Sequence, residues 1–272
     1  MTLPDRHIDL GAECLRNGRR WGAIPSGYTM VVDANGSRLV VRDDHKNAIT
    51  PRTCRERFAG GLPGRFQGRG ELKSISLSSG ESALIRAYRH GGAMRYLSAD
   101  VFFTWPPRPF RELTLTEALR RRGIATLEVY GAAVEPVWGP FYRGWLITRE
   151  LSDANDLWAA FQTGLVRAVG IDACLLAAAR SVRNLHSAGV YHADLNLKNI
   201  LLRQEKSGVK GYVIDLDKAR LYPGPLPRRM AKRNLSRLYR SILKKDPRQS
   251  YIVPTDWERF LEFYHDREPR PC

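Results

Sequence analysis

The pattern of hydrophobic and polar positions divides the chain into a β-rich first half and a mostly helical second half. In the first half, short apolar runs are bounded by turn residues, and they predict strands at 28–44, 83–88 and 128–151. The first run is interrupted by Asn35-Gly36, a dipeptide typical of a tight hairpin turn. One helix is expected in this half, over 109–123, because Leu115 and Leu119 are four residues apart.

The second half has the apolar spacing of helices. Its longest predicted helix covers 172–189, with Asp172 expected as the N-cap and Gly189 just past the end. Thr255 and Glu258 have the spacing of a capping box and predict the start of the last helix. The other elements expected here are a short buried strand at 211–219 and helices at roughly 228–244 and 255–265.

Composition fits a globular protein. The 272 residues are enough to bury a core, as one large domain or two lobes, and 43% of them are hydrophobic. No stretch reaches about 18 apolar residues, so no transmembrane helix is expected, and the charged N-terminus does not predict a signal peptide. The four cysteines are far apart in the sequence and are expected to be free thiols in a reducing compartment; they are Cys14, Cys54, Cys174 and Cys272.

The chain is strongly basic, with 44 Lys and Arg residues against 28 Asp and Glu residues and a net charge of +16. This charge favours an anionic partner, which would be nucleic acid, an acidic membrane surface or a phosphorylated ligand. The alternative is a solvated cationic surface with no dedicated partner. Charge alone does not separate these alternatives.

Candidate chemistry gathers in the stretch YHADLNLKN, residues 191–199. Asp194 and Asn199 have the spacing of the HRDxxxxN catalytic loop of kinases. An Asp at that position can accept the proton of an attacking hydroxyl, and an Asn five residues later can hold a magnesium ion. Asp215 follows sixteen residues after Asn199, at the end of a predicted strand, and could supply a second oxygen ligand for the cation.

A structural alternative exists for these residues. Asp194 and Asp215 would then be caps or surface acids, and His192 would be a core histidine with its hydrogen bonds satisfied. However, a carboxylate directly after the buried run 212–214 is costly without a partner. The ordered combination therefore favours a catalytic site.

Several longer stretches extend these signals: IPSGY, RLVVRDD, GRG, LIRAYRHGG, FRELTLTEALRRRGI, LITREL, VYHADLNLKNILL, VIDLDKAR and NLSRLYRSILKK. Together they resemble the kinase-like lipopolysaccharide-core kinases of Gram-negative bacteria, and most closely the kinases of 3-deoxy-D-manno-octulosonic acid (Kdo). The resemblance covers nearly the whole chain after about residue 20. The combination of DLNLKNILL, DLDKAR and NLSRLYRS is its most specific part.

The resemblance implies an α+β, two-lobed fold like that of protein kinases. The first part, 1–150, would hold an N-terminal extension and a lobe with an antiparallel sheet and one helix. The second part, 151–272, would be a mostly α lobe shortened at its C-terminus. Only 57 residues follow Asp215 and no APE motif is present, which argues against a protein kinase and leaves a small or exposed hydroxyl acceptor, such as a sugar.

The same resemblance implies roles for single residues. Asp194 would be the catalytic base, and Asn199 and Asp215 would hold Mg²⁺. Arg86 stands in the place of the strand lysine that contacts the ATP phosphates in kinases, and a guanidinium can do this bidentately. Glu112 would pair with Arg86, although an ordinary surface pair is the alternative.

The phosphate-covering loop implied by the resemblance would lie around 66–71. Only Gly68 and Gly70 match there, and the full GxGxxG pattern is absent.

The reaction implied by the resemblance transfers the γ-phosphoryl group of ATP to the 4-hydroxyl of Kdo on a lipid A precursor. The protein would be attached peripherally to the anionic cytoplasmic face of the inner membrane, with no nucleic-acid partner. Three alternatives remain open. They are a kinase of the core heptose, a kinase of protein or of a small soluble molecule, and a non-catalytic basic module that binds nucleic acid or membrane.

The basic helix expected at 228–244 bears on the acceptor. Its apolar residues recur at helical spacing and indicate an amphipathic helix packed on the second lobe; they are Leu235, Leu238, Tyr239 and Ile242. The basic face is either only solvated or also contacts anionic phospholipid or substrate. The residues predicted for that contact are Arg228, Arg229, Lys232 and Arg233.

Overall fold

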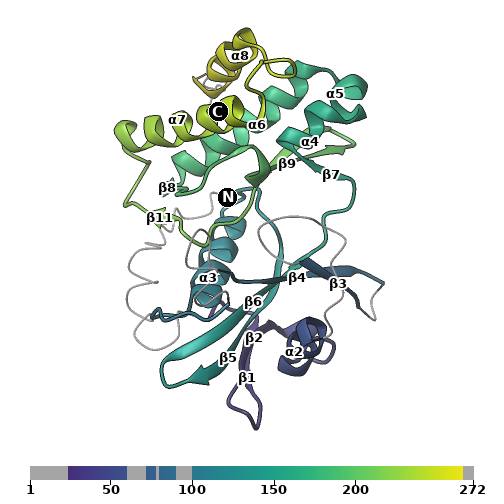
Figure 1. The fold of residues 1–272 in the computed structure, drawn as a ribbon, viewed down its shortest axis with the longest axis vertical. Helices are drawn as coiled ribbons and strands as arrows, with labels where there is room; N and C mark the ends of the chain where they lie inside the picture. The colour runs from purple at the N-terminus through teal and green to yellow at the C-terminus, as the bar shows by residue number, and fades with distance from the viewer. Residues whose placement is uncertain (1–23, 60–71, 78–79, 90–99, 266–272) are drawn as a thin grey trace, which may run out of the picture. The chain divides into compact units, whose positions relative to one another are not determined.

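The computed structural model describes residues 24–59, 72–77, 80–89 and 100–265, so the predicted loop residues Gly68 and Gly70 lie outside the described residues. The chain forms two compact units (Figure 1). The first joins 1–118 with 128–150, and the second joins 119–127 with 151–272. The first unit ends at Glu150, and the segment Leu119–Leu127 groups with the second unit.

The first unit is built on a six-stranded sheet in the order β1-β2-β5-β6-β4-β3, with every neighbouring pair antiparallel. Its strands are β1 (Tyr28–Val32), β2 (Arg38–Arg42), β3 (Leu72–Ser76), β4 (Ser82–Ala87), β5 (Val129–Trp138) and β6 (Phe141–Arg149). The predicted hairpin is confirmed, with Met30 opposite Val40. In its turn Gly36 has a φ of 76°, a conformation that favours glycine, and its N–H donates to the carbonyl of Asp33 at 3.0 Å.

A helix covers each face of this sheet. The helices are α2 (Pro51–Ala59) and α3 (Arg108–Arg121), and a short 3₁₀ turn, η1 (Asp43–His45), follows β2. Because side chains alternate along a strand, Leu39 packs in the cluster that contains Cys54 of α2, and its neighbour Val40 packs in the cluster that contains Phe110 of α3. The sheet is therefore buried on both sides.

The helix α2 is a second helix in a unit for which the sequence predicted one. Pro51 occupies its first position, where a missing N–H costs nothing. Thr50 and Thr53 cap it reciprocally: the N–H of Thr53 donates to Oγ1 of Thr50 at 3.2 Å, and the N–H of Thr50 donates to Oγ1 of Thr53 at 3.3 Å. The capping box was not recognised because threonine stands where glutamate or glutamine is usual.

The second unit is mostly helical. Its helices are α4 (Leu157–Gln162), α5 (Gly164–Val169), α6 (Ile171–Ser187), the 3₁₀ turn η3 (Leu197–Asn199), α7 (Arg228–Lys245) and α8 (Pro254–His265). Its strands are β7 (Ala154–Asp156), β8 (Val190–Tyr191), β9 (Ile200–Glu205), β10 (Gly208–Val213) and β11 (Arg220–Leu221). They form two small antiparallel sheets, β10-β9-β7 and β11-β8.

The central helix α6 lies directly against β10. A Cβ on Gly211 of β10 would come within 2.4 Å of the carbonyl oxygen of Ala177 in α6, so only glycine allows this close approach. The helix and the strand that leads to Asp215 are thereby fixed against each other.

Two predicted caps are wrong. The helix α6 begins at Ile171 with Gly170 as its N-cap, and Asp172 lies in the first turn, where its carboxylate accepts from Nη1 of Arg259 at 2.7 Å. The helix α8 begins at Pro254, one residue before Thr255. Asp256 in its first turn reaches back, and its Oδ2 accepts from the N–H of Val253, the residue before the helix, at 2.9 Å. An early proline displaced the predicted capping box, because proline is favoured at the first helical position.

Cys54 and Cys174 are buried free thiols, as expected, and burial raises the pKa of Cys174 to about 11. Cys14 and Cys272 lie outside the described residues. Among the helices of the described residues, none combines the length and the apolar composition of a membrane-spanning segment.

Candidate active site

The loop that carries Asp194 follows a forced turn at the end of α6. Gly189 has a φ of 79°, and a Cβ on it would come within 2.2 Å of the carbonyl oxygen of Gly224. Only glycine fits this turn, which directs the chain into β8 and the loop beyond it. The C-terminal signal predicted at this position is confirmed.

The backbone of Asp194 is fixed on both sides. Its carbonyl oxygen accepts from Nδ2 of Asn196 and from Nδ2 of Asn199, both at 2.8 Å. Its N–H donates to Nδ1 of His192 at 3.1 Å. No described residue hydrogen-bonds its carboxylate, which is therefore available to a ligand while the backbone behind it is immobilised.

His192 joins this loop to the strand end that precedes Asp215. The side chain is 1% exposed, and its Nε2 donates to the carbonyl oxygen of Ile214 at 2.9 Å. Since Nδ1 accepts from the N–H of Asp194, the imidazole is neutral with its proton on Nε2. Burial lowers the pKa of His192 and favours this neutral form. His192 is thus a core histidine with both nitrogens engaged, and it also sets the spacing of two candidate functional segments.

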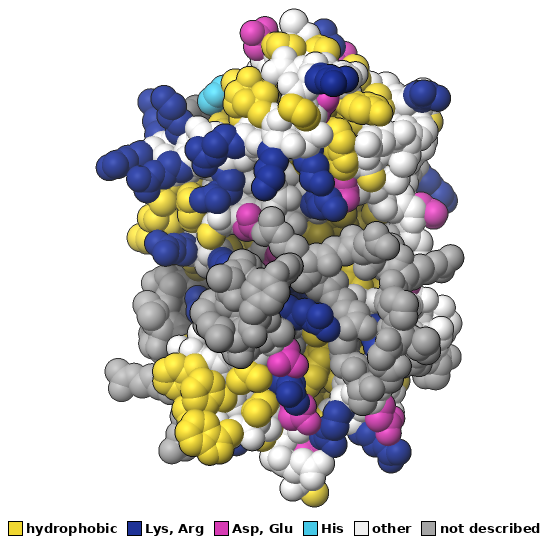
Figure 2. All heavy atoms as spheres, viewed as in Figure 1, with side chains coloured by type: hydrophobic (Ala, Val, Ile, Leu, Met, Phe, Trp, Pro, Cys, Tyr) yellow, Lys and Arg dark blue, Asp and Glu magenta, His cyan; other side chains and the backbone are white. Residues whose placement is uncertain are grey.

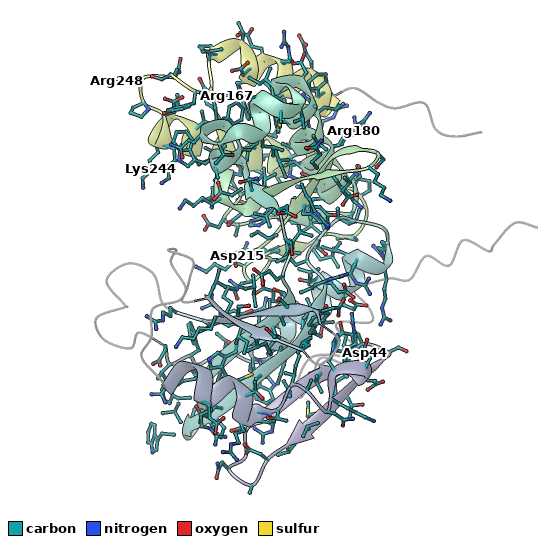
Figure 3. All side chains as sticks on the ribbon, turned by 90° about the vertical axis from the view of Figure 1, so that its right-hand side faces the viewer. Asp44, Arg167, Arg180, Asp215, Lys244 and Arg248 are labelled. Carbon is teal, nitrogen blue, oxygen red and sulfur yellow. The ribbon has the colours of Figure 1, made fainter. Side chains whose placement is uncertain are left out.

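Asn199 and Asp215 lie at the same end of the β9–β10 pair. Val213 is opposite Ile200 in the register, and the next N–H, that of Ile214, donates to the carbonyl oxygen of Asn199 at 3.0 Å. Asp215, labelled in Figure 3, has a φ of 62°, which is a strained conformation for a residue other than glycine. Such outliers persist where the surrounding structure enforces them.

The donor set of these two residues fits a hard divalent cation. Nδ2 of Asn199 is engaged by the carbonyl of Asp194, so its Oδ1 is the atom that remains for a ligand. Asp215 adds a carboxylate. An amide oxygen and a carboxylate suit a Mg²⁺ ion that keeps water and phosphate oxygens as its other ligands.

The helix α7 supports the candidate catalytic loop, residues 192–199, through Asn234, a residue for which no role was predicted. Asn234 is 0% exposed; its Nδ2 donates to the carbonyl of His192 at 2.7 Å, and its Oδ1 accepts from the N–H of His192 at 3.0 Å. In the same helix, Oγ of Ser241 accepts from the N–H of Leu197 at 3.2 Å. An asparagine within the apolar stripe of α7, beside Leu235, was the available signal.

The Asn234 contact continues to the last helix. Oδ1 of Asn234 also lies 3.2 Å from Nε2 of His186, and Nδ1 of His186 lies 2.8 Å from the hydroxyl of Tyr264 in α8. Asn234 already donates through Nδ2, so Nε2 of His186 carries a proton and Nδ1 accepts from Tyr264. Burial lowers the pKa of His186 to about 4, and the imidazole is neutral at physiological pH.

In the first unit, Arg86 of β4 and Glu112 of α3 form the predicted ion pair. Nη2 of Arg86 lies 2.6 Å from Oε2 of Glu112, which also accepts from the hydroxyl of Tyr88. Glu112 is 2% exposed and Arg86 26%, so this is not an ordinary surface pair. The guanidinium also lies over the ring of Tyr88, 5.0 Å from its centroid. The arginine is therefore oriented by both neighbours.

The amphipathic character predicted for α7 is confirmed. The predicted contact residues are all exposed; they are Arg228, Arg229, Lys232 and Arg233. The opposite side buries Leu235, Leu238 and Ile242. Figure 2 shows Lys and Arg side chains gathered over this helix, at the upper left of the view.

The chain matches the lipopolysaccharide kinase (Kdo/WaaP) family over residues 62–264. It is 32% identical over 212 residues to the 3-deoxy-D-manno-octulosonic acid kinase of Pasteurella multocida, a match that covers 74% of this chain and 83% of the relative. It is 30% identical over 232 residues to the same kinase of Actinobacillus succinogenes, with coverages of 83% and 92%.

Among solved structures, WaaP in complex with acyl carrier protein is similar, with a TM-score of 0.55, 23% identity, and coverage of 85% of this chain and 90% of that one. The shared fold confirms the predicted α+β, protein-kinase-like architecture. The predicted enzyme class, a phosphotransferase that acts on a sugar hydroxyl, is also confirmed. Fold and sequence agree: this chain belongs to the lipopolysaccharide kinase (Kdo/WaaP) family.

Proposed function

We propose that this protein transfers the γ-phosphoryl group of ATP to the 4-hydroxyl of Kdo on a lipid A precursor, with Mg²⁺ as the metal ion. The observation that carries the proposal is the state of Asp194. Its backbone is fixed by three hydrogen bonds, and its carboxylate is unengaged in the described residues. The names of the relatives support Kdo as the acceptor.

In this proposal Asp194 receives the acceptor hydroxyl and takes its proton as the oxygen attacks phosphorus. A base of this kind contributes chiefly by position, because the phosphoryl transfer itself needs alignment more than covalent help. The hydrogen bonds that Asp194 accepts from Asn196 and Asn199 and donates to His192 provide that alignment before substrate arrives.

Asn199 and Asp215 would hold the metal through Oδ1 and the carboxylate. The metal ion, when bound, neutralises negative charge on the ATP phosphates. Arg86 would contact the ATP phosphates through its guanidinium, which the ion pair with Glu112 orients.

The proposed site of action is the cytoplasmic face of the inner membrane, with peripheral attachment. The exposed cations of α7, which include Arg228 and Arg233, support an anionic substrate or surface. A core heptose acceptor is the second candidate, because the family takes its name from WaaP as well as from Kdo.

The test is phosphoryl transfer from γ-labelled ATP and Mg²⁺ to Kdo-bearing lipid A precursor. The same reaction is run with the precursor that lacks Kdo, with Asp194→Ala and with Asp172→Ala, which removes an exposed acid of the same unit. Label that requires Kdo and Asp194 but not Asp172 is expected. A heptose-bearing core acceptor is tested in parallel. Label on that acceptor alone would replace Kdo by heptose as the substrate, and ATP binding without phosphoryl transfer to any acceptor would overturn the proposal.

A further inference from the structure

The hairpin that joins β5 to β6 ends in an exposed aromatic cluster. The tip consists of Val137, Trp138 and Phe141, and Phe103 packs beside it. Trp138 is 74% exposed and Phe103 67%. Phe141 stacks on Trp138 with ring centroids 5.7 Å apart and planes 16° apart, and it contacts Phe103 at the same centroid distance. We call these four residues the aromatic tip.

The backbone presents the aromatic tip outward. Trp138 and Phe141 are cross-strand partners on either side of the two-residue turn Gly139-Pro140, in which Gly139 has a φ of 50°. The register shifts between Pro136 and Trp138, so Val137 is the additional residue of a β-bulge and is 44% exposed. Figure 2 shows apolar side chains gathered at the lower left, where Figure 1 places this hairpin.

Polarity changes sharply along the hairpin. The five residues from Val137 to Phe141 carry no charged side chain. The first charges behind them are Glu135 and Arg143, which face each other across the strands. An apolar end with a charged collar is the arrangement of a segment that enters the interfacial layer of a membrane, whereas exposed aromatic clusters of this kind are uncommon on a surface that meets only water.

We infer that the aromatic tip inserts into the interface of an anionic lipid bilayer. The inference rests on the proposed function in one respect: a lipid-linked acceptor would be held in such a bilayer, where the protein would have to reach it. Two features favour lipid over a second protein. First, the indole of Trp138 is the one hydrogen-bonding side chain of the aromatic tip, so the tip suits the apolar edge of the acyl layer. Second, the protein has a net charge of +16 and is attracted to anionic headgroups.

The first experiment is flotation of the full chain with vesicles of phosphatidylcholine, alone or mixed with phosphatidylglycerol, without any Kdo lipid. The double variant Trp138→Ser with Phe141→Ser is expected to lower partition onto the mixed vesicles by about tenfold or more. It lacks the two aromatic side chains whose transfer from water into the lipid interface favours binding. Val137→Glu leaves both rings in place and is expected to have the same effect through repulsion. Val32→Ser removes another exposed apolar residue of the same unit and is expected to change nothing.

A depth measurement makes the test independent of folding effects. Trp138→Phe keeps an apolar ring, so binding should persist, but the fraction of tryptophan fluorescence quenched by brominated lipids should fall, because Trp138 is the tryptophan that the aromatic tip places at the acyl edge. Unchanged quenching, or unchanged flotation of the serine and glutamate variants, overturns the inference. A wild-type dimer that the same variants dissociate, with vesicle binding unaltered, assigns the aromatic tip to a second copy and also overturns it.

Activity assays separate this inference from the proposed function. The variants of the aromatic tip are expected to lose about tenfold in kcat/KM on acceptor embedded in vesicles and to retain wild-type activity on a soluble, deacylated Kdo acceptor. If the wild type phosphorylates neither acceptor but its vesicle binding depends on the aromatic tip, the proposed function fails and this inference stands. If transfer occurs but the tip variants act on vesicles like the wild type, the inference fails and the function stands.

Discussion

Nε2 of His192 donates to the carbonyl oxygen of Ile214 at 2.9 Å, and this one bond joins the loop of the proposed base to the strand end of a proposed metal ligand. Replacing His192 by Phe keeps the ring volume and removes both ring hydrogen bonds. We expect a loss of about 2 kcal/mol in the free energy of unfolding, because the Asp194 N–H and the Ile214 carbonyl lose their partner. We also expect kcat to fall by at least tenfold.

The measurement is urea unfolding together with steady-state kinetics. His265→Phe is the control, since His265 is exposed at the end of α8. Wild-type kcat in His192→Phe would show that the spacing of the two segments does not depend on this bond.

Stability should depend on pH through His186. Burial lowers its pKa from 6.5 to about 4, so the folded state binds fewer protons than the unfolded chain. Its contribution is therefore complete above about pH 6.5 and is lost as the pH falls toward 4, with a size of about 3 kcal/mol. His192, whose pKa is also lowered by burial, acts in the same direction.

Urea unfolding across this pH range tests the prediction. His186→Gln should have a shallower dependence than the wild type, because one of the titrating groups is gone. The prediction fails if the two proteins lose stability in parallel.

Asn234 should position the catalytic loop rather than touch substrate. Asn234→Leu leaves the N–H and the carbonyl of His192 buried without partners, and we expect a loss of about 3 kcal/mol in unfolding free energy. Asn234→Asp keeps the acceptor and is expected to recover part of that loss, while its carboxylate raises the pKa of His186 beside it.

Nuclear magnetic resonance titration of His186 separates this positioning role from general destabilisation. Ser236→Leu, on the exposed side of the same helix, is the control. A His186 pKa in Asn234→Asp equal to that of the wild type would contradict the contact.

The Arg86–Glu112 pair should contribute to stability and to nucleotide affinity. Arg86→Ala leaves Glu112 buried without its cation, and we expect a cost of about 3 kcal/mol and weaker ATP binding. Arg86→Lys retains the positive charge but not the two-pronged guanidinium, so ATP affinity should fall less than in Arg86→Ala. Arg149→Ala, which removes exposed ion pairs of the neighbouring strand, should cost less than about 1 kcal/mol. Calorimetric ATP binding that is equal in all three variants would exclude a phosphate contact for Arg86.

The basic cluster of α7 should act through charge. Reversal of Arg228, Arg229, Lys232 and Arg233 to Glu is expected to raise KM for the lipid acceptor at low salt, to leave the KM for ATP unchanged and to flatten the salt dependence. Reversal of exposed Lys206, in the β9–β10 turn, is the control. A salt dependence as steep as that of the wild type would show that this face is only solvated.

Local patterns predicted this fold where the signal lay within a few residues. The Asn35-Gly36 turn, the glycine after α6 and the apolar stripe of α7 each depend on neighbours in the sequence, and each is present. The caps of α6 and α8 and the existence of α2 were not predicted, because Gly170, Pro254 and a threonine pair replaced the commoner capping residues.

The candidate site also has one part that the sequence predicted and one part that it did not. The spacing of Asp194, Asn199 and Asp215 is visible in the sequence because they lie on one continuous loop and strand pair. The support from Asn234, forty-two residues after His192, depends on how α7 packs, and the local pattern does not specify which residue Asn234 contacts. Buried polar residues in an apolar stripe are the signal that would have indicated it.

The hydroxyl of Tyr264 reaches His186, His186 reaches Asn234, and Asn234 reaches the backbone of His192. We expect a chain of buried and half-buried polar contacts of this kind to open as a unit, because breaking one hydrogen bond leaves the next polar group without a partner in an apolar surrounding. Amide protons of α8 and of the catalytic loop should therefore exchange with solvent at matching rates. The helix α8 would then be part of the catalytic loop's cooperative folding unit, although Tyr264 lies seventy residues after Asp194 in the sequence.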